Sequence, residues 1–374
     1  MNGTIRVGNL FGIPFYIHPS WFLVLGLVTW SYSSGLAAQF PLISGGLAVV
    51  LGLMTALLLF ASVVAHELGH SFVAIRQGID VKSITLFIFG GLASLEKESK
   101  TPVEAFWVAI AGPLVSLVLF GSMTAIGFAT AVSGPLAAII GVLASVNLAL
   151  ALFNLIPGLP LDGGNILKAA VWKITGNPYK GVVFASRVGQ ILGWVAVISG
   201  VLPLLLFGDF GNFWNLLIGF FLLQNAGNTA QFARVQEKLT GLTAEDAVTV
   251  DSPVVSANLT LREFADQRFI SGQNWQRFLV TDDEGQLVGA IAVDNMRSIP
   301  TAMWLQTQVR EVMQPVAQST TVQSDQPLLE VVQLLEQQKL SALPVIRNNG
   351  VLVGILEKAA VIQLLQGRTQ PNPA

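Results

Sequence analysis

Six long apolar stretches dominate the first two thirds of the chain. Each contains about 20 or more mostly apolar residues, the length that an α-helix needs to cross the hydrocarbon core of a bilayer. The pattern predicts a multi-pass α-helical membrane protein with six transmembrane helices, at residues 17–37, 46–75, 105–132, 136–156, 182–206 and 213–232. The second stretch is long for one crossing, which indicates a helix that is tilted or projects from the membrane.

Residues 81–95, between the second and third apolar stretches, follow a different pattern. They are rich in β-branched and aromatic residues, are too short to cross as a helix, and contain the paired glycines Gly90 and Gly91. Because an open strand cannot face lipid, we expect a short membrane-associated β-hairpin that packs against protein. Such a hairpin is either a structural loop or an edge strand that binds an extended substrate.

The chain after residue 239 has the mixed pattern of a soluble α+β fold and contains a repeat. Gly-Gln-Leu-Val-Gly at 285–289 recurs as Gly-Val-Leu-Val-Gly at 350–354, and each copy combines an amphipathic helical stretch with two short strands. This pattern predicts one β-α-β type of unit used twice. The expected divisions are therefore a membrane domain, two soluble modules and a tail, at residues 1–238, 239–300, 301–368 and 369–374.

Composition supports this division. Only 11% of the residues are charged and the mean hydropathy is +0.64, whereas a soluble domain carries about 25% charged residues. The charged residues are sparse up to residue 238 and frequent after it. The net charge of −2 argues against binding of nucleic acid. The absence of cysteine excludes disulfides, thiolate metal ligands and a cysteine nucleophile.

The basic residues of the membrane domain predict its orientation. Every cluster falls before the first span or after an even-numbered span: Arg6; Arg76, Lys82, Lys97 and Lys100; Lys168, Lys173, Lys180 and Arg187; Arg234 and Lys238. Lys and Arg accumulate on the cytoplasmic side of membrane proteins. We therefore expect both termini in the cytoplasm, in a bacterial plasma membrane or the membrane of an organelle of bacterial descent.

His66, Glu67 and His70 form an H-E-x-x-H motif directly after a run, 7–65, that contains no charged residue. On a helix, the two histidines share one face and can bind one metal ion. Glu67 can then act as a general base toward a metal-bound water. The alternative is a chance match on a helix surface, but ionisable residues in so apolar a helix indicate a functional site.

Asp162 is the best candidate for a third ligand. A catalytic zinc site needs three protein ligands, and without cysteine the third must be His18, an aspartate or a glutamate. Asp162 is the first charged residue after the uncharged run 105–161, and it follows the helix-breaking Pro157 and Pro160. A broken helix at membrane depth is tolerated where it lines a cavity or is buried in protein. The alternative is that Asp162 caps the helix that begins there.

These motifs together resemble the site-2 protease family of intramembrane zinc metalloproteases. The residues 66–70 on the second predicted helix are followed by N-x-x-P-x-x-P-L-D-G-G at 154–164, a pattern typical of that family. Ala-Gly-Pro at 111–113, the glycine pair at 90–91 and His-Pro at 18–19 are further points of resemblance. The repeated C-terminal modules resemble a pair of CBS domains.

The resemblance implies an intramembrane zinc metalloendopeptidase with one Zn²⁺ per subunit. Its zinc would be bound by His66, His70 and Asp162, and Glu67 would activate the water. Asn154 would position the substrate or stabilise the oxyanion, although an asparagine there can instead link neighbouring helices.

For other family positions the resemblance implies less. Gly90 and Gly91 would contact substrate. His18 matches a family position but can equally be an interfacial side chain at a helix start. The family often has an asparagine where this chain has Ser116, which leaves the role of that residue open.

By the same resemblance, the enzyme would hydrolyse a peptide bond within or near the transmembrane segment of a membrane protein, in regulated intramembrane proteolysis. The CBS pair would regulate the enzyme or form a homodimer. The hydroxyl and carboxylate that contact the ribose of an adenine nucleotide are missing at 289–295 and 354–360, so nucleotide binding is not favoured. The alternative is a CBS-gated membrane transporter or channel with a metal site, against which stand Glu67 and the absence of an inverted repeat.

Overall fold

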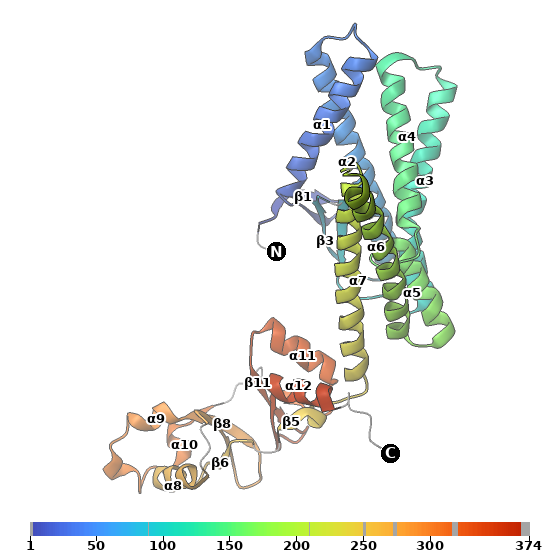
Figure 1. Ribbon diagram of the computed structural model, residues 1–374. Helices are drawn as coiled ribbons and strands as arrows, with labels where there is room; N and C mark the ends of the chain where they lie inside the picture. The colour runs from blue at the N-terminus through green and yellow to red at the C-terminus, as the bar shows by residue number, and fades with distance from the viewer. Residues whose placement is uncertain are drawn as a thin grey trace. The chain divides into compact units, whose positions relative to one another are not determined.

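The computed structural model describes residues 3–88, 90–208, 210–249, 252–271, 275–315 and 321–367. The chain divides into two compact units, Met1–Arg234 and Val235–Ala374. The first unit is built from long helices and one small sheet, and the second from short strands and helices (Figure 1).

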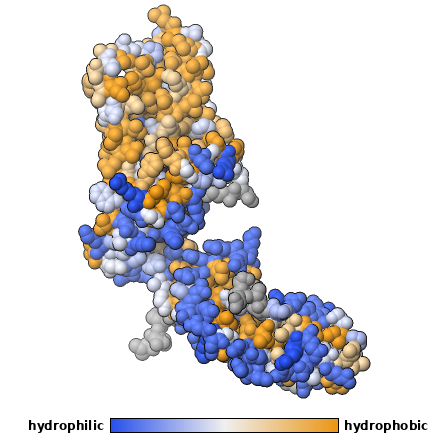
Figure 2. Space-filling model, turned by 180° about the vertical axis from the view of Figure 1, so that it is seen from behind, coloured by the Kyte–Doolittle hydropathy of each residue, from blue (hydrophilic) through white to orange (hydrophobic). Residues whose placement is uncertain are grey.

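Five helices of the described residues are long and apolar enough to cross a membrane: α1 (Ser20–Gln39), α2 (Gly45–Arg76), α3 (Pro102–Ala129), α4 (Gly134–Asn154) and α6 (Pro178–Phe207). They coincide with the first five predicted spans. Many of their large apolar side chains are exposed, including Trp30, Leu205 and Phe207. The face in Figure 2 is mostly hydrophobic over the helical unit and mostly hydrophilic over the second unit. The exposed apolar surface is the one that lipid would cover.

Helix α7 (Phe213–Leu239) occupies the position of the sixth predicted span. It is long enough to cross a membrane, but it does not reach the hydropathy of a span because its sequence includes Asn215, Gln224, Asn225, Asn228 and Gln231. The sixth crossing therefore stays a prediction. Helices α6 and α7 approach each other closely where Gly193, Gly200 and Gly219 leave no side chain between the backbones.

A four-stranded sheet with the order β1-β2-β3-β4 packs against α2. Its strands are β1 (Ile5–Leu10), β2 (Ile13–Ile17), β3 (Val81–Phe87) and β4 (Gly90–Leu95). The hairpin predicted at 81–95 is confirmed: β3 and β4 pair antiparallel, with Ile84 opposite Ala93. The N-terminal strands were not predicted, because the parallel pairing of β2 with β3 joins segments that lie far apart in the sequence. Strand β4 is left at an edge of the sheet.

The second unit contains two four-stranded sheets, β6-β7-β8-β9 and β10-β11-β12-β5. The strands are β5 (Val248–Thr249), β6 (Val254–Ser256), β7 (Arg277–Thr281), β8 (Leu287–Ala292), β9 (Gln314–Pro315), β10 (Val322–Gln323), β11 (Ala342–Ile346) and β12 (Leu352–Glu357). The helices are α8 (Leu261–Ser271), α9 (Val293–Arg297), α10 (Val309–Val312), α11 (Leu328–Gln337) and α12 (Lys358–Gly367). Each repeat thus forms a mixed sheet with helices, as the pattern predicted.

Each of the two sheets is completed by a strand from the other half of the sequence repeat. Strand β5 precedes the first sheet in sequence but pairs with β12 of the second sheet, with Thr249 opposite Ile355. Val309 is buried in the first core beside Phe264 and Ile291. The predicted domain boundaries at 238/239 and 300/301 stay predictions. In space, each module uses residues from both sides of the 300/301 boundary.

The repeated glycine motif lies where the two modules meet. Leu287 donates its N–H to the carbonyl of Gly350 at 3.1 Å, and Leu352 donates to the carbonyl of Gly285 at 2.9 Å. Gly285 and Gly350 have φ of 75° and 82°, which side chains rarely adopt. The sequence repeat therefore marks a symmetric contact between the two turns.

Close packing of α1 on α2 depends on Gly52. A Cβ atom at this position would overlap Ser33 Oγ, which donates to the carbonyl of Thr29 at 2.6 Å and is thereby fixed. We expect Gly52→Val to lower the free energy of unfolding by about 1–3 kcal/mol through overpacking. Thermal unfolding of the full chain in detergent measures the effect. Gly121→Val on α3 is the matched control, because nothing lies within 4 Å of that position, and equal loss in both variants would contradict the packing argument.

Candidate metal centre

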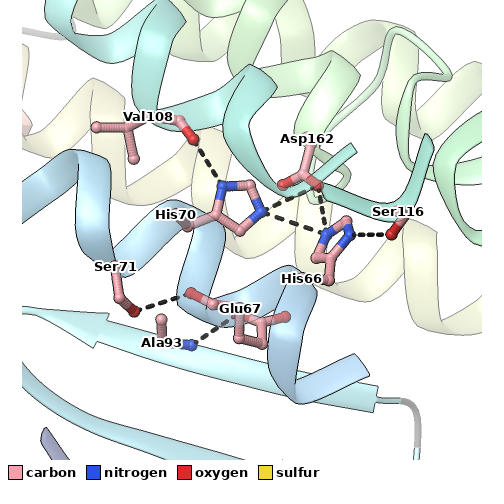
Figure 3. A network of polar contacts seen from close by, with 8 residues as sticks. All are labelled: His66, Glu67, His70, Ser71, Ala93, Val108, Ser116 and Asp162. Atoms are coloured by element: carbon pink, nitrogen blue, oxygen red, sulfur yellow. Dashed lines mark hydrogen bonds and ion pairs between the residues drawn. The ribbon is translucent and has the colours of Figure 1, made fainter. Parts of the chain in front are cut away.

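Three possible metal ligands converge between α2 and α5 (Asp162–Thr175). His66 Nε2 lies 3.1 Å from Asp162 Oδ2, His70 Nε2 lies 3.2 Å from the same oxygen, and the two Nε2 atoms are 3.3 Å apart (Figure 3). Two ligands held about 2.0–2.1 Å from a tetrahedral zinc are about 3.3 Å from each other. The spacing of the three atoms therefore fits one zinc ion.

The partners of the two histidines direct both Nε2 atoms to this point. His70 Nδ1 lies 2.6 Å from the carbonyl oxygen of Val108, which can only accept, so Nδ1 carries the proton and Nε2 is free to bind a metal. His66 Nδ1 lies 2.9 Å from Ser116 Oγ, and Ser116 is fully buried. A hydrogen bond to the second ring nitrogen is the usual support of a metal-binding histidine.

Gly112 on α3 leaves space at the centre. A Cβ atom there would lie 2.6 Å from His66 Nε2 and would overlap His70 Nε2. At this position α3 approaches the two imidazoles with its backbone, which accounts for the glycine of the Ala-Gly-Pro sequence at 111–113.

The chain break after α4 brings Asp162 to the site. Helix α4 ends at Asn154, and α5 begins at Asp162 itself. Between them, Leu159 donates its N–H to the carbonyl of Ala185 on α6 at 3.2 Å. This contact is close because Gly189 has no Cβ to meet the Leu159 carbonyl. The loop is therefore held against α6, and the first residue of the next helix points at the histidines.

The side chain of Glu67 extends from α2 to the edge strand β4. Its Oε2 accepts a hydrogen bond from the N–H of Ala93 at 3.2 Å, and Gly91 allows the approach, since a Cβ there would lie 2.5 Å from Glu67 Cγ. Successive residues of a strand point their N–H groups to opposite sides. The N–H groups of Gly91, Ala93 and Leu95 therefore face away from β3, toward the side on which Glu67 lies.

Other residues singled out in the sequence lie apart from this cluster. Asn154 is the last residue of α4, half-buried, and among the described residues it forms no hydrogen bond with the three ligand candidates. His18 is exposed, and its Nδ1 lies 2.8 Å from Ser20 Oγ at the start of α1. Gly90 begins β4 with φ of 132°.

One buried polar contact near the site was missed in the sequence. Asn147 on α4 is fully buried and donates to Ser62 Oγ on α2 at 3.1 Å, one turn before His66. A polar side chain within the uncharged run 105–161 was the available signal. The contact fixes α4 against the helix that carries both histidines.

Known proteins resemble this chain over nearly its whole length. The profile of peptidase family M50 matches residues 54–132 and 120–196, which contain both histidines and Asp162, and a CBS domain profile matches 309–367. A protein of Synechocystis sp. that is named as a zinc metalloprotease is 59% identical over 366 residues, which cover 98% of this chain and 96% of that protein. The zinc metalloprotease Rip3 of Mycobacterium tuberculosis, named in the same way, is 31% identical over 382 residues, covering 100% of this chain and 96% of the relative.

A solved structure, the site-2 protease from Methanocaldococcus jannaschii, is 29% identical, with a TM-score of 0.43 over 61% of this chain and 95% of that one. The identities to the full-length relatives, together with the two profiles, establish the family without this structural match. The chain belongs to peptidase family M50, the site-2 proteases, and is a zinc metalloprotease with a C-terminal CBS pair.

Proposed function

We propose that His66, His70 and Asp162 bind the catalytic zinc of this protease and that Glu67 is its general base. The observation that supports the proposal is the convergence of three ligand atoms within 4.8 Å of one another, with Glu67 on the same turn of α2 as the two histidines. The two Nε2 atoms and the carboxylate fit zinc by type and by spacing. The site would thereby hydrolyse a peptide bond within or near the transmembrane segment of a membrane protein.

The residues of the site divide the reaction between them. Zinc, when bound, activates water and polarises the carbonyl group of the bond that is cleaved. Glu67 accepts a proton from the attacking water and then donates it to the nitrogen that leaves. Ser116 and the Val108 carbonyl keep the two imidazoles oriented while this happens. The surrounding apolar helices keep bulk water out and strengthen the interactions of these charges.

Strand β4 is the proposed binding edge for the substrate backbone. A peptide bond in a helix is already hydrogen-bonded, so the substrate must unwind before it is cleaved. The outward N–H group of Gly91 can pair with such an extended segment next to Glu67, and the N–H of Ala93 can do so once the Glu67 carboxylate releases it. Gly90 and Gly91 carry no side chain that would hinder the approach. Asn154 is proposed to position the substrate or the developing oxyanion from the end of α4.

The remaining roles concern partners and location. The family acts on membrane proteins, and we propose that the substrates span the membrane once and that cleavage releases a regulator from the membrane. We also propose that both termini lie in the cytoplasm, as the basic residues predict. The CBS pair is proposed to be a regulatory or dimerising module rather than a nucleotide sensor. In its first copy Asn295 stands at the position of the missing ribose carboxylate, and the neighbouring Asp294 pairs with Arg297 at 3.1 Å.

Replacing Glu67 by glutamine separates chemistry from metal binding. We expect Glu67→Gln to lower cleavage of a reconstituted single-span substrate by about 10²–10⁴-fold, because the amide cannot accept the proton of water. Zinc content, measured by elemental analysis, should stay that of the wild type. Glu104→Gln is the matched control, since glutamine preserves the capping box at the start of α3. Undiminished cleavage by Glu67→Gln would refute the assignment.

Replacing Ser116 by alanine tests the orientation of His66. We expect Ser116→Ala to weaken zinc binding by about 10–100-fold, because the imidazole loses the partner of Nδ1. A competition titration with a zinc chelator measures the affinity. Ser122→Ala on the same helix is the control, since among the described residues its hydroxyl bonds the Val118 carbonyl of its own helix and no ligand candidate. Equal affinities of the two variants would show that Ser116 does not support the ligand.

A further inference from the structure

A cavity of about 280 Å³ adjoins the metal centre. It lies among α2, α3, α5, the end of β4 and the loop that joins β4 to α3. The residues of its wall that matter here are His70, Leu95, Glu98, Asp162, Asn165 and Lys168. Two of the proposed zinc ligands are part of this wall, so a segment bound in the cavity is next to the bond that is cleaved.

One face of α5 leads from the metal centre to a charged end of the cavity. Asp162, Asn165, Lys168 and Trp172 follow one another at three- and four-residue intervals, and all four line the cavity. Lys168 lies six residues beyond Asp162, which is about 9 Å along a helix. An extended peptide covers that distance with about three residues.

The charged end is an ion pair whose two members are unequally exposed. Lys168 Nζ lies 2.8 Å from Glu98 Oε2; the lysine side chain is 16% exposed and the glutamate side chain 76%. An ammonium group has three donors, and Glu98 is the partner found for it among the described residues. The lysine is thus a fixed part of the cavity wall, whereas the glutamate can move into water at little cost.

We propose that Lys168 recognises a carboxylate of the substrate, the side chain of an Asp or Glu about three residues from the cleaved bond, and that Glu98 occupies this position in the free enzyme. The inference rests on the proposed function and names a determinant of specificity within it. Strand β4 supports this position for the substrate segment. The backbone N–H groups of Gly91, Ala93 and Leu95 that face away from β3 extend from Glu67 to the cavity wall.

The unequal exposure of Lys168 and Glu98 determines whether an acidic or a basic substrate side chain is favoured. An incoming carboxylate replaces Glu98 on Lys168, and Glu98 regains water. A basic residue would have to pull Glu98 away and leave the mostly buried ammonium without a partner, which is costly. Asn165, half-buried on the same face, provides an amide that can donate to the same carboxylate.

The test uses the full-length zinc enzyme in liposomes and a single-span substrate carrying Asp, Asn or Lys at each position within about four residues on either side of the cleaved bond. At the substrate position that reaches Lys168, Asp should give a kcat/KM about tenfold higher than Asn, which is the effect of one charge-assisted hydrogen bond. Lys168→Met should remove this preference. Lys173→Met, an exposed lysine on the same helix outside this cavity, should keep it.

Two further variants keep the test decisive if Lys168→Met folds poorly. Lys168→Glu should shift the preference from Asp to Lys at the same position, and Glu98→Gln should raise kcat/KM for the Asp substrate, since the competitor is gone. The inference would be overturned if the wild type cleaved the substrates without a preference for Asp. It would also be overturned if the wild type preferred Lys and Glu98→Gln removed that preference. A wild type that cleaves none of the substrates would instead contradict the proposed function.

Discussion

The cost of placing ionisable groups in an apolar helical domain governs the structure of this protein. A buried polar group without a partner is destabilising, and lipid offers none. Each imidazole of the centre accordingly has a fixed partner for Nδ1, and both Nε2 atoms are directed at Asp162. One turn away, the buried Nδ2 group of Asn147 is likewise bonded, to Ser62 Oγ and to the Leu143 carbonyl. The partners that make the site stable are therefore also those that give it the geometry of a metal centre.

Glycine determines how closely the parts of the site approach. Gly112 lets α3 reach the imidazoles, Gly91 lets β4 reach Glu67, and Gly189 lets α6 hold the loop before Asp162. Without a hydrophobic force between helices in lipid, such close backbone contacts and their hydrogen bonds contribute much of the association. A side chain at any of these positions would separate elements that the chemistry needs together.

The centre and the adjoining cavity together suggest how the enzyme combines general chemistry with selectivity. In the proposed arrangement, the backbone edge of β4 binds an extended segment through N–H groups, which carry no side-chain preference. The pair of Lys168 and Glu98 lies beyond that edge and offers charge. Unwinding and backbone pairing would make a peptide bond accessible. The charge of the cavity would then favour an acidic segment, which remains bound long enough to be cleaved.

The sequence by itself determined the local features. The apolar stretches predicted five helices that are long and apolar enough to span a membrane. The spacing of His66 and His70 predicted a shared helix face, and Pro157 and Pro160 predicted the break before Asp162. These features depend on neighbours within a few residues, which a periodic pattern records. The sixth crossing stays a prediction, because the polar residues of α7 weaken the same signal.

Only the tertiary structure decided what lies opposite these residues. The partners Ser116 for His66, Ala93 for Glu67 and Glu98 for Lys168 come from segments many residues away. The pairing of β2 with β3 and of β5 with β12 is of the same kind. No local pattern encodes such contacts, because they arise when helices and strands pack to satisfy buried polar groups and to exclude voids.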